Sequence, residues 1–276
     1  MKYKMIAVDM DGTLLKDNKE VSDINKEAIR KACEAGVKVV VCTGRIFTSA
    51  KAYAKIIGSM APIIASNGAY IREKDKNEVV YERTLEKEDL LKVVNLAKEG
   101  GFYPHIYTTN TIYTEKLIFA SKNYATWNES LAEKDRVIIE IVEDLNEVIE
   151  SGRYQFIKAV VMGDDIEKLN FLRKKISAEV EVSIMSSVHN NFEVTAFGTS
   201  KGHGVEILAH FYGITKEEVI CIGDSENDIS MIEYAGLGVA MDNAPDYIKA
   251  KADYITDSNE EDGVASVIEK FILNNK

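Results

Sequence analysis

Two aspartates, Asp9 and Asp11, stand one residue apart where a short apolar run, Met5–Val8, ends. Like charges so close repel each other, and the end of a buried strand offers little solvation. A surface turn would explain the pair, because Asp and Gly gather in turns for local reasons. A bound cation would explain it too, and Mg²⁺ prefers such oxygen ligands. A third explanation is that one carboxyl stays protonated. The buried strand before the pair favours the cation.

A second acidic cluster, Gly223-Asp224-Ser225-Glu226-Asn227-Asp228, follows another apolar run. Asp224 and Asp228 bracket an expected strand-to-helix transition, and Asn227 lies near the start of the helix. A capping loop has the same composition, so the cluster alone decides nothing. Together with the first aspartate pair, it favours a shared site for a hard cation.

Two further segments have the chemistry to meet an anion. Thr43-Gly44-Arg45 precedes a helix, and a helix N-terminus with a hydroxyl and a glycine binds anions readily. An ordinary helix cap would use the same residues. Lys201 follows Ser200 in the first turn of another helix, where a cation opposes the helix dipole. Many such lysines are simply solvated, but the unfavourable place favours another role.

Short β-branched apolar runs recur along the chain, and their lack of alternation suits parallel strands buried on both faces. Amphipathic stretches at 22–35, 46–57 and 200–212 fill gaps between them, which predicts a doubly wound, Rossmann-like α/β sheet. The carboxyl ends of such strands form the ligand crevice, so the polar residues that follow them should meet at one edge. The runs are Met5–Val8, Val37–Cys42, Pro62–Ala65, Val219–Ile222 and Leu237–Ala240.

The helix over 22–35 shows how the sequence should place its ends and its buried face. Ser22 is the expected N-cap, and Gly36 should end the helix. The spacing of the apolar residues predicts the face turned to the core. The expected core positions are Ile24, Ala28, Ile29 and Ala32.

The strand–helix alternation is interrupted after Arg83, where a helix over 84–97 begins a different pattern. Strands at 104–108, 157–162, 180–185 and 191–195, with a helix over 165–176, predict a sheet with one face open to solvent. Phe197-Gly198-Thr199-Ser200 is typical of a linker. We therefore expect an α/β core formed by 1–84 and 197–276, and a large α+β cap domain inserted at 85–196.

Length and composition limit the possible functions. The 276 residues suggest two domains. The net charge of −11 argues against nucleic-acid binding, although a local cation still allows an anionic substrate. The apolar runs are too short for a membrane span, and the first one lacks the pattern of a signal peptide. An odd number of cysteines, three, favours reduced thiols and a cytoplasmic location.

The segment Asp9-Met10-Asp11-Gly12-Thr13-Leu14 resembles motif I of the haloacid dehalogenase (HAD) superfamily. Thr43 resembles motif II, Lys201-Gly202 motif III and Gly223–Asp228 motif IV, in the order expected for that family. Thr43-Gly44-Arg45, Ser66-Asn67-Gly68-Ala69 and the insertion after the third core strand are similar to the Cof-like subgroup of cytoplasmic phosphatases. The resemblance covers the whole core and the position of the cap.

This resemblance implies a Mg²⁺-dependent phosphatase, a phosphoric monoester hydrolase that acts on a small phosphorylated metabolite. Asp9 would form an aspartyl-phosphate, and Asp11 would protonate the leaving alcohol and then deprotonate water. The surroundings of Asp11 should therefore raise its pKa. The metal would be held by Asp9, the main-chain carbonyl of Asp11 and Asp224, with Asp228 binding through water or from a supporting position.

The same resemblance implies a set of contacts to the phosphoryl group and the substrate. Phosphoryl oxygens would be held by Thr43, Lys201, Asn227 and the main-chain N–H groups near Met10 and Gly44. Arg45 and Asn67 are candidate substrate contacts. Sugar phosphates, pyridoxal phosphate and flavin mononucleotide all suit this subgroup, and the oligomeric state stays open.

Two other functions are compatible with the same core residues. A phosphomutase would use them with a bisphosphate activator. A non-catalytic sensor would only bind a phosphorylated metabolite. A plain nucleotide-binding scaffold is disfavoured, because the sequence has no glycine-rich phosphate loop.

Overall fold

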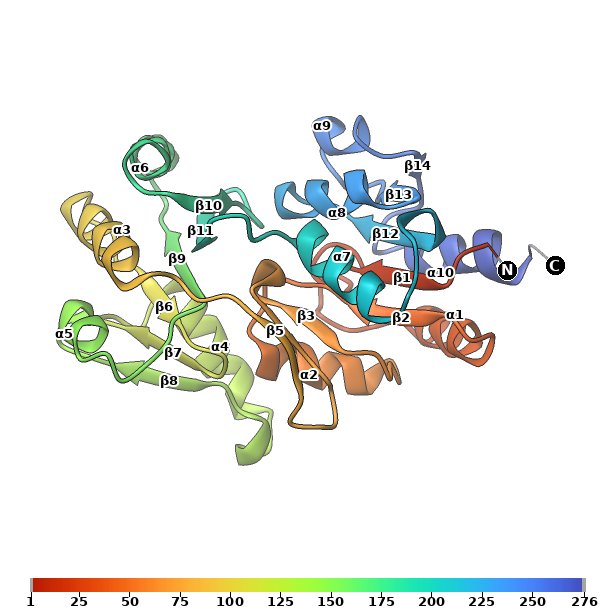
Figure 1. Ribbon diagram of the computed structural model, residues 1–276, viewed down its shortest axis with the longest axis horizontal. Helices are drawn as coiled ribbons and strands as arrows, with labels where there is room; N and C mark the ends of the chain where they lie inside the picture. Colours follow the sequence, from red (N-terminus) through yellow and green to blue (C-terminus); the bar gives the residue numbers. More distant parts are fainter. Residues whose placement is uncertain (1, 275–276) are drawn as a thin grey trace. The chain divides into compact units, whose positions relative to one another are not determined.

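The computed structural model describes residues 2–274, and the chain forms two compact units. The core unit comprises Met1–Arg45, Ala50–Tyr81 and Ser200–Lys276, and the cap unit comprises Ile46–Ser49 and Glu82–Thr199. Both are drawn in Figure 1. The domain boundaries expected from the sequence, at 84/85 and 196/197, stay a prediction.

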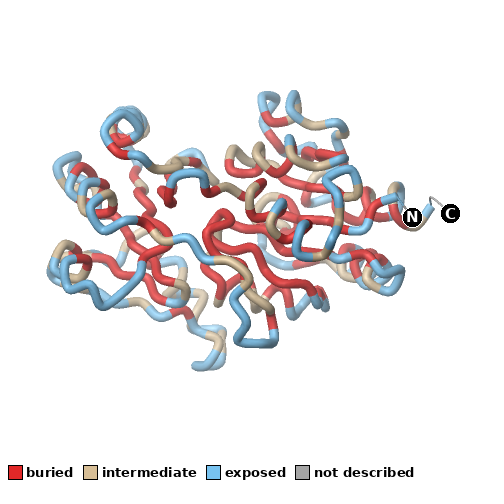
Figure 2. Tube along the Cα trace, viewed as in Figure 1, coloured by how far each residue is buried: buried red, intermediate tan, exposed pale blue. Residues whose placement is uncertain are grey.

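The core unit is built on a five-stranded parallel sheet with the order β14-β13-β12-β1-β2. All four positions of β1 are buried, so its alternate side chains fill both faces, as expected for a doubly wound sheet. The central strands of this sheet are buried (Figure 2), whereas β14 at one edge is partly exposed. The predicted fold class is confirmed. The strands are β1 (Met5–Val8), β2 (Lys38–Val41), β12 (Val219–Gly223), β13 (Leu237–Ala240) and β14 (Tyr254–Ile255).

Helices lie on both sides of this sheet. Helices α7 (Lys201–Phe211) and α8 (Ile229–Tyr234) pack on the face that carries Met5 and Ala7. Helices α1 (Asp23–Glu34) and α10 (Gly263–Ile268) pack against each other, and α1 also contacts β2. The remaining helices of this region are α2 (Phe47–Ile56) and α9 (Asp246–Lys249).

Helix α1 confirms most of its predicted features. The Ser22 hydroxyl accepts the N–H of Asn25, and Gly36 follows the helix with a φ of 90°. The prediction that Ile24 faces the core is wrong, because its side chain is 58% exposed. Asn25 is fully buried instead, and its Oδ1 accepts the Ala265 N–H at 2.9 Å. The helix therefore turns a polar residue inward to serve the first turn of α10.

The run Pro62–Ala65 forms a strand, but its pairing differs from the expected one. β3 (Ile63–Ala65) belongs to a three-stranded sheet with β4 (Tyr70–Arg72) and β5 (Val79–Glu82). A single parallel bridge, Cys42 to Ile64, joins β3 to the edge of the core sheet. The sequence did not predict this hairpin, because its tight turn uses left-handed backbone at non-glycine residues.

The cap unit contains a six-stranded mixed sheet with the order β10-β11-β9-β6-β7-β8. Helices α3, α5 and α6 supply side chains to the apolar core on one face of this sheet. The strands are β6 (His105–Tyr107), β7 (Thr111–Thr114), β8 (Ile138–Ile141), β9 (Lys158–Met162), β10 (Val182–Met185) and β11 (Asn191–Ala196). The helices are α3 (Lys87–Glu99), α4 (Phe119–Glu129), α5 (Leu145–Glu150) and α6 (Ile166–Glu179).

The expectation that one face of this sheet is open to solvent is wrong for its central strands. Tyr107 and Val160 are buried in a second cluster that includes Tyr124 and Trp127 of α4. The sequence pattern of β9 and β11 did not reveal this, because their second face also carries charged residues. Short helical turns complete the fold: η1 (Ser66–Gly68), η2 (Glu133–Asp135), η3 (Lys216–Glu218), η4 (Glu226–Asp228) and the π-helical turn η5 (Glu269–Leu273).

The inward-facing Asn25 gives a prediction that can be tested against its neighbour. Asn25→Ala should destabilise the protein by about 1–3 kcal/mol, because the buried Ala265 N–H loses its partner. Ile24→Ala should change stability by about 0.5 kcal/mol or less, because the side chain is exposed. Urea unfolding followed by circular dichroism measures both. A larger loss for Ile24→Ala would contradict the assigned face of α1.

Candidate active site

The centre of the core unit's polar edge is a buried lysine between two carboxylates. Lys201 Nζ lies 2.6 Å from Asp9 Oδ1 and 2.5 Å from Asp228 Oδ1. Lys201 and Asp228 are fully buried, and Asp9 is 5% exposed. Asp9 follows β1, Asp228 ends η4, and Lys201 begins α7. The unfavourable position of Lys201 in its helix is explained by these two ion pairs.

The second oxygen of Asp228 organises the loop after β12. Asp228 Oδ2 accepts the N–H groups of Asp224 and Ser225, each at 2.9 Å. Both oxygens of Asp228 therefore already have partners from the protein: Lys201 on one side and the loop backbone on the other. This arrangement ties the loop to the start of α7.

Asp224 is held by hydroxyl groups. Thr13 Oγ1 donates to Asp224 Oδ1 at 2.7 Å, and Ser225 Oγ donates to Asp224 Oδ2 at 3.0 Å. Gly12 makes this approach possible: its φ is 79°, and a Cβ there would lie 2.4 Å from Asp224 Oδ2. Only glycine fits that position without displacing the carboxylate.

Burial and mutual repulsion change the protonation of these carboxyls. Burial raises the pKa of Asp9 well above its usual value, and the charge of Asp228 raises it further. Burial and the charge of Asp228 raise the pKa of Asp224 to about 6. Burial alone would lower the pKa of Lys201, but Asp228 and Asp9 raise it. Lys201 is therefore charged, and the carboxyls lack enough positive charge around them.

The acidic group has the composition of a binding site for a hard divalent cation. Oxygens of Asp9, Asp224 and Asp228 lie within 4.8 Å of one another. Three carboxylates and one ammonium leave two net negative charges, which one divalent cation would cancel. Carboxylate oxygens are the ligands that such cations prefer. The residues present therefore fit a metal ion of this kind.

The carboxylate of Asp11 lies apart from this group and has different partners. Arg45 binds it with two hydrogen bonds, Nε to Oδ2 and Nη2 to Oδ1, both 2.7 Å long. Lys19 Nζ lies 3.1 Å from Oδ1. Burial would raise the pKa of Asp11, but Arg45 and then Lys19 lower it to about 2. The expectation of a raised pKa is therefore wrong for this state, because the two cations favour the carboxylate.

The ends of β2 and β3 and the turn η4 are joined by another set of hydrogen bonds. The N–H of Asn67 donates to the carbonyl of Thr43 at 3.0 Å, and the Thr43 hydroxyl accepts the N–H of Arg45 at 3.1 Å. Asn227 Nδ2 donates to Asn67 Oδ1 at 3.0 Å. Asn67 has left-handed backbone, with a φ of 56°. Asn67 thus reaches the end of β2 through its main-chain N–H and the turn after β12 through its side-chain oxygen.

The polar residues expected at one edge are therefore brought together, in three linked groups. Asp9, Asp224, Asp228 and Lys201 form the first, Asp11 and Arg45 the second, and Thr43, Asn67 and Asn227 the third. The side chain of Met10 is fully buried, and Gly44 lies between Thr43 and Arg45.

Sequence reasoning missed two contacts of this edge. Thr13 is fully buried and positions Asp224, a contact that the spacing of the carboxylates does not indicate. A buried hydroxyl after a glycine at a strand end would have been the signal. Lys19 lies in a turn eight residues after Asp11, and no sequence spacing marks it as a partner.

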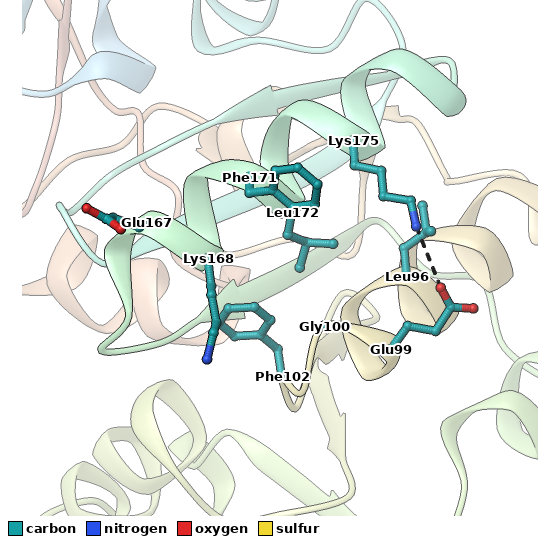
Figure 3. A pocket seen from close by; sticks show the side chains of 9 residues that line it. All are labelled: Leu96, Glu99, Gly100, Phe102, Glu167, Lys168, Phe171, Leu172 and Lys175. Atoms are coloured by element: carbon teal, nitrogen blue, oxygen red, sulfur yellow. Dashed lines mark ion pairs between the residues drawn. The ribbon is translucent and has the colours of Figure 1, made fainter.

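A cavity in the cap unit is unrelated to these residues. It lies between α3 and α6 and has a volume of about 530 Å³. Apolar side chains line it together with two acidic and two basic ones, Glu99, Glu167, Lys168 and Lys175 (Figure 3). Lys175 lies 3.7 Å from Glu99. None of the predicted site residues lines it.

Comparisons with known proteins identify the family. The model of haloacid dehalogenase-like hydrolases matches residues 6–268. The chain is 35% identical to the putative phosphatase YxeH of Bacillus subtilis, over 98% of this chain and 99% of that protein. It belongs to the haloacid dehalogenase-like hydrolases. The predicted family and the prediction of an enzyme of the phosphatase class are confirmed.

Another relative and a solved structure agree with this assignment. The 5-amino-6-(5-phospho-D-ribitylamino)uracil phosphatase YcsE of Bacillus subtilis is 33% identical, over 98% of this chain and 96% of that protein. A haloacid dehalogenase-like hydrolase from Bacteroides thetaiotaomicron has a TM-score of 0.83 and 31% identity, over 98% and 100% of the two chains. None of the helices in the described part of the chain has the length and apolar character of a membrane span.

The buried lysine gives a direct test of the charge balance in this HAD site. In metal-free protein at neutral pH, Lys201→Met should cost about 3–5 kcal/mol of stability, because two buried carboxylates lose their cation. Lys251→Met, which removes an exposed pair with Glu233, should cost about 0–1 kcal/mol. Urea unfolding compares the two. Equal losses would show that Lys201 does not balance the buried charges.

Proposed function

We propose that this protein is a Mg²⁺-dependent phosphatase that hydrolyses small phosphorylated metabolites through an aspartyl-phosphate on Asp9. One observation carries the proposal: a buried Asp9 carboxylate at the end of β1 shares Lys201 with Asp228 and lies beside Asp224. A carboxylate nucleophile and a phosphate are both anionic, so the reaction needs cations among its carboxylates. The charge deficit of two in this group supports a bound divalent ion.

The metal would be held by Asp9, Asp224 and the main-chain carbonyl of Asp11. Mg²⁺ bound there would neutralise charge on the phosphoryl group and on the nucleophile. Both oxygens of Asp228 already have protein partners, so we assign Asp228 a supporting position rather than a direct bond to the metal. This support would keep Lys201 and Asp224 in place.

Asp9 would act as the nucleophile. Lys201 holds Asp9 Oδ1, so Oδ2 is the oxygen that attacks phosphorus. The new bond joins Asp9 to phosphorus while the bond from phosphorus to the alcohol oxygen breaks. A water molecule then attacks the same phosphorus, phosphate leaves, and Asp9 regains its carboxylate.

Asp11 would carry the protons of both steps. It gives a proton to the departing alcohol and later accepts one from the attacking water. The ionised form in this structure is the form that the second step requires. A bound phosphate dianion beside Asp11 would favour the protonated form that the first step requires, because like charges oppose ionisation. Arg45 and Lys19 hold both oxygens of Asp11 in this structure, so the oxygen that takes the proton would first leave its cation.

Thr43, Lys201, Asn227 and the N–H groups near Met10 and Gly44 would hold the phosphoryl oxygens. The Asn227 side chain is 95% buried, and its Oδ1 has no hydrogen-bond partner among the described residues. An oxygen accepts and does not donate, so Asn227 would meet a phosphoryl oxygen only after its amide turns over. Asn67, which accepts from Asn227, would then exchange partners during substrate binding.

The substrate class we propose comprises sugar phosphates, pyridoxal phosphate and flavin mononucleotide. We add 5-amino-6-(5-phospho-D-ribitylamino)uracil, which the name of the relative YcsE specifies. The net charge of −11 supports a small substrate over a nucleic acid. Free cysteines in the described chain, two of them buried, are compatible with a cytoplasmic location.

A screen of these esters for phosphate release with Mg²⁺ separates the proposal from its alternatives. We expect hydrolysis of at least one ester without any bisphosphate. Isomerisation that depends on a bisphosphate would instead show a phosphomutase. Binding without turnover across the whole panel would show a sensor.

The nucleophile assignment predicts the behaviour of one variant. Asp9→Asn should lower turnover by more than about a thousandfold while the protein stays folded, because an amide cannot form the phosphoryl intermediate. Asp23→Asn, at an exposed position of α1, should retain full activity. Phosphate release and circular dichroism measure the two effects. Clear turnover by Asp9→Asn would remove Asp9 from this role.

The raised pKa of Asp224 predicts how metal and pH act together. Without metal, the folded protein keeps a proton on Asp224 that the unfolded chain loses, so stability should fall as pH rises from about 4 to about 6. Mg²⁺ must displace that proton, so its stabilising effect should be larger at about pH 7.5 than at about pH 5.

Thermal unfolding in EDTA and in excess Mg²⁺ measures this difference. Asp224→Asn is the matched control, because it removes the titrating group and should lose most of the metal-dependent shift. The same stabilisation by Mg²⁺ at both pH values would contradict the assignment of Asp224 as a ligand.

A further inference from the structure

The guanidinium of Arg45 stacks on a buried aromatic ring and also binds Asp11. The guanidinium carbon lies 5.0 Å from the centre of the Tyr53 ring. Tyr53 belongs to α2 and is only 6% exposed, so its ring is fixed by the packing around it. Stacking on an aromatic face sets the plane of a guanidinium, and that plane determines where a carboxylate can be bound at two points.

Tyr53 also contacts the segment that supplies the second cation. Its hydroxyl donates to the carbonyl of Lys19 at 3.3 Å. The backbone of Lys19 is left-handed, with a φ of 67°, and its N–H donates to the carbonyl of Lys16 at 2.8 Å. Lys19 Nζ lies 3.1 Å from Asp11 Oδ1. One buried tyrosine thus restrains both cations that bind Asp11.

Among the described residues, Arg45 and Lys19 are the hydrogen-bond partners of the Asp11 side chain. Asp11 lies in the loop after β1, directly before Gly12, and its side chain is 39% exposed. A carboxyl that donates a proton must stay within hydrogen-bond reach of the departing oxygen. Holding a partly exposed side chain in one orientation costs conformational entropy. The two hydrogen bonds from Arg45 fix the orientation of Asp11 before substrate binds, so that cost does not add to the reaction barrier.

We propose that Tyr53 is a positioning residue of the hydrolysis, acting on Asp11 through Arg45 and Lys19. This inference rests on the proposed function, in which Asp11 is the general acid. In the first step, the proton moves from Asp11 to the alcohol oxygen as the bond from phosphorus to that oxygen breaks. Tyr53 and Arg45 form and break no covalent bond. Arg45 thereby positions the acid, and its expected contact with the substrate stays a prediction.

Two classes of ester separate this role from a purely structural one. An alkyl alcohol needs a proton in order to leave, whereas p-nitrophenolate leaves without one. The ratio kcat/KM reports the steps up to departure of the alcohol, so it isolates the step in which Asp11 acts as an acid. The test therefore compares p-nitrophenyl phosphate with an alkyl phosphate that the wild-type protein hydrolyses in the panel above.

Tyr53→Leu removes the ring and should lower kcat/KM for the alkyl phosphate by about tenfold or more, a part of what a general acid contributes. The value for p-nitrophenyl phosphate should change by less than about twofold. Tyr53→Phe keeps the ring and should recover most of the alkyl phosphate activity. Arg45→Lys removes the two-point contact and should reproduce the selective loss, even if Tyr53→Leu fails to fold.

A matched control is Tyr254→Leu. It removes another cation–π contact of the core unit, in which Lys270 Nζ lies 4.2 Å from the ring centre. This variant should affect both esters equally. Thermal unfolding of each variant shows whether it is folded.

Equal losses of both activities in Tyr53→Leu and Arg45→Lys would overturn the inference and leave the proposed function intact. Full activity of both variants on the alkyl phosphate would overturn it as well. Failure of the folded wild-type protein to hydrolyse any ester would overturn the proposed function itself, and the inference with it.

Discussion

A fully buried ammonium between two carboxylates connects three distant parts of the core unit: the end of β1, the turn η4 and the first turn of α7. Any one of these charges alone would be too costly to bury. Parallel pairing of β1 with β12 brings Asp9 and the loop of Asp228 to the same edge. Gly202 lets α7 approach α8, because a Cβ there would lie 2.3 Å from the carbonyl oxygen of Ser230. The strand pairing and the close approach of α7 to α8 thus place Lys201 between Asp9 and Asp228.

The carboxylates at this edge carry more negative charge than Lys201 balances, and this excess changes their protonation. Asp9 and Asp224 have raised pKa values because they are buried near Asp228. A divalent cation would remove the penalty and prepare Asp9 for attack. Asp11 is in the opposite situation, since Arg45 and Lys19 keep it ionised. Two aspartates one residue apart therefore experience opposite fields, which suits a nucleophile and a proton carrier.

The parts that sequence could predict are those fixed by local pattern. Four of the five predicted apolar runs form strands of the core sheet, whereas Pro62–Ala65 lies in a sheet with β4 and β5 and no run marked β14. The polar residues that follow β1, β2 and β12 lie close together, because parallel strands share an edge. The sequence also indicated a special role for Lys201, because a lysine in the first turn of a helix opposes the helix dipole. The pairing of Arg45 with Asp11 was not, because a long side chain has many possible partners. The left-handed backbone of Asn67 and the buried side chain of Asn25 were not predicted for a related reason. Each residue forms a hydrogen bond with a main-chain group far along the chain, Thr43 for Asn67 and Ala265 for Asn25.

The central claim is that Asp9 carries the phosphoryl group, and chemical trapping tests it most directly. The protein is mixed with substrate and Mg²⁺, quenched in acid within one turnover, reduced with borohydride and digested for mass spectrometry. The account predicts homoserine at position 9, because borohydride reduces an acyl phosphate but leaves a free carboxylate unchanged. Reduction at a different carboxyl, or an unmodified Asp9 in protein that is turning over substrate, would contradict it.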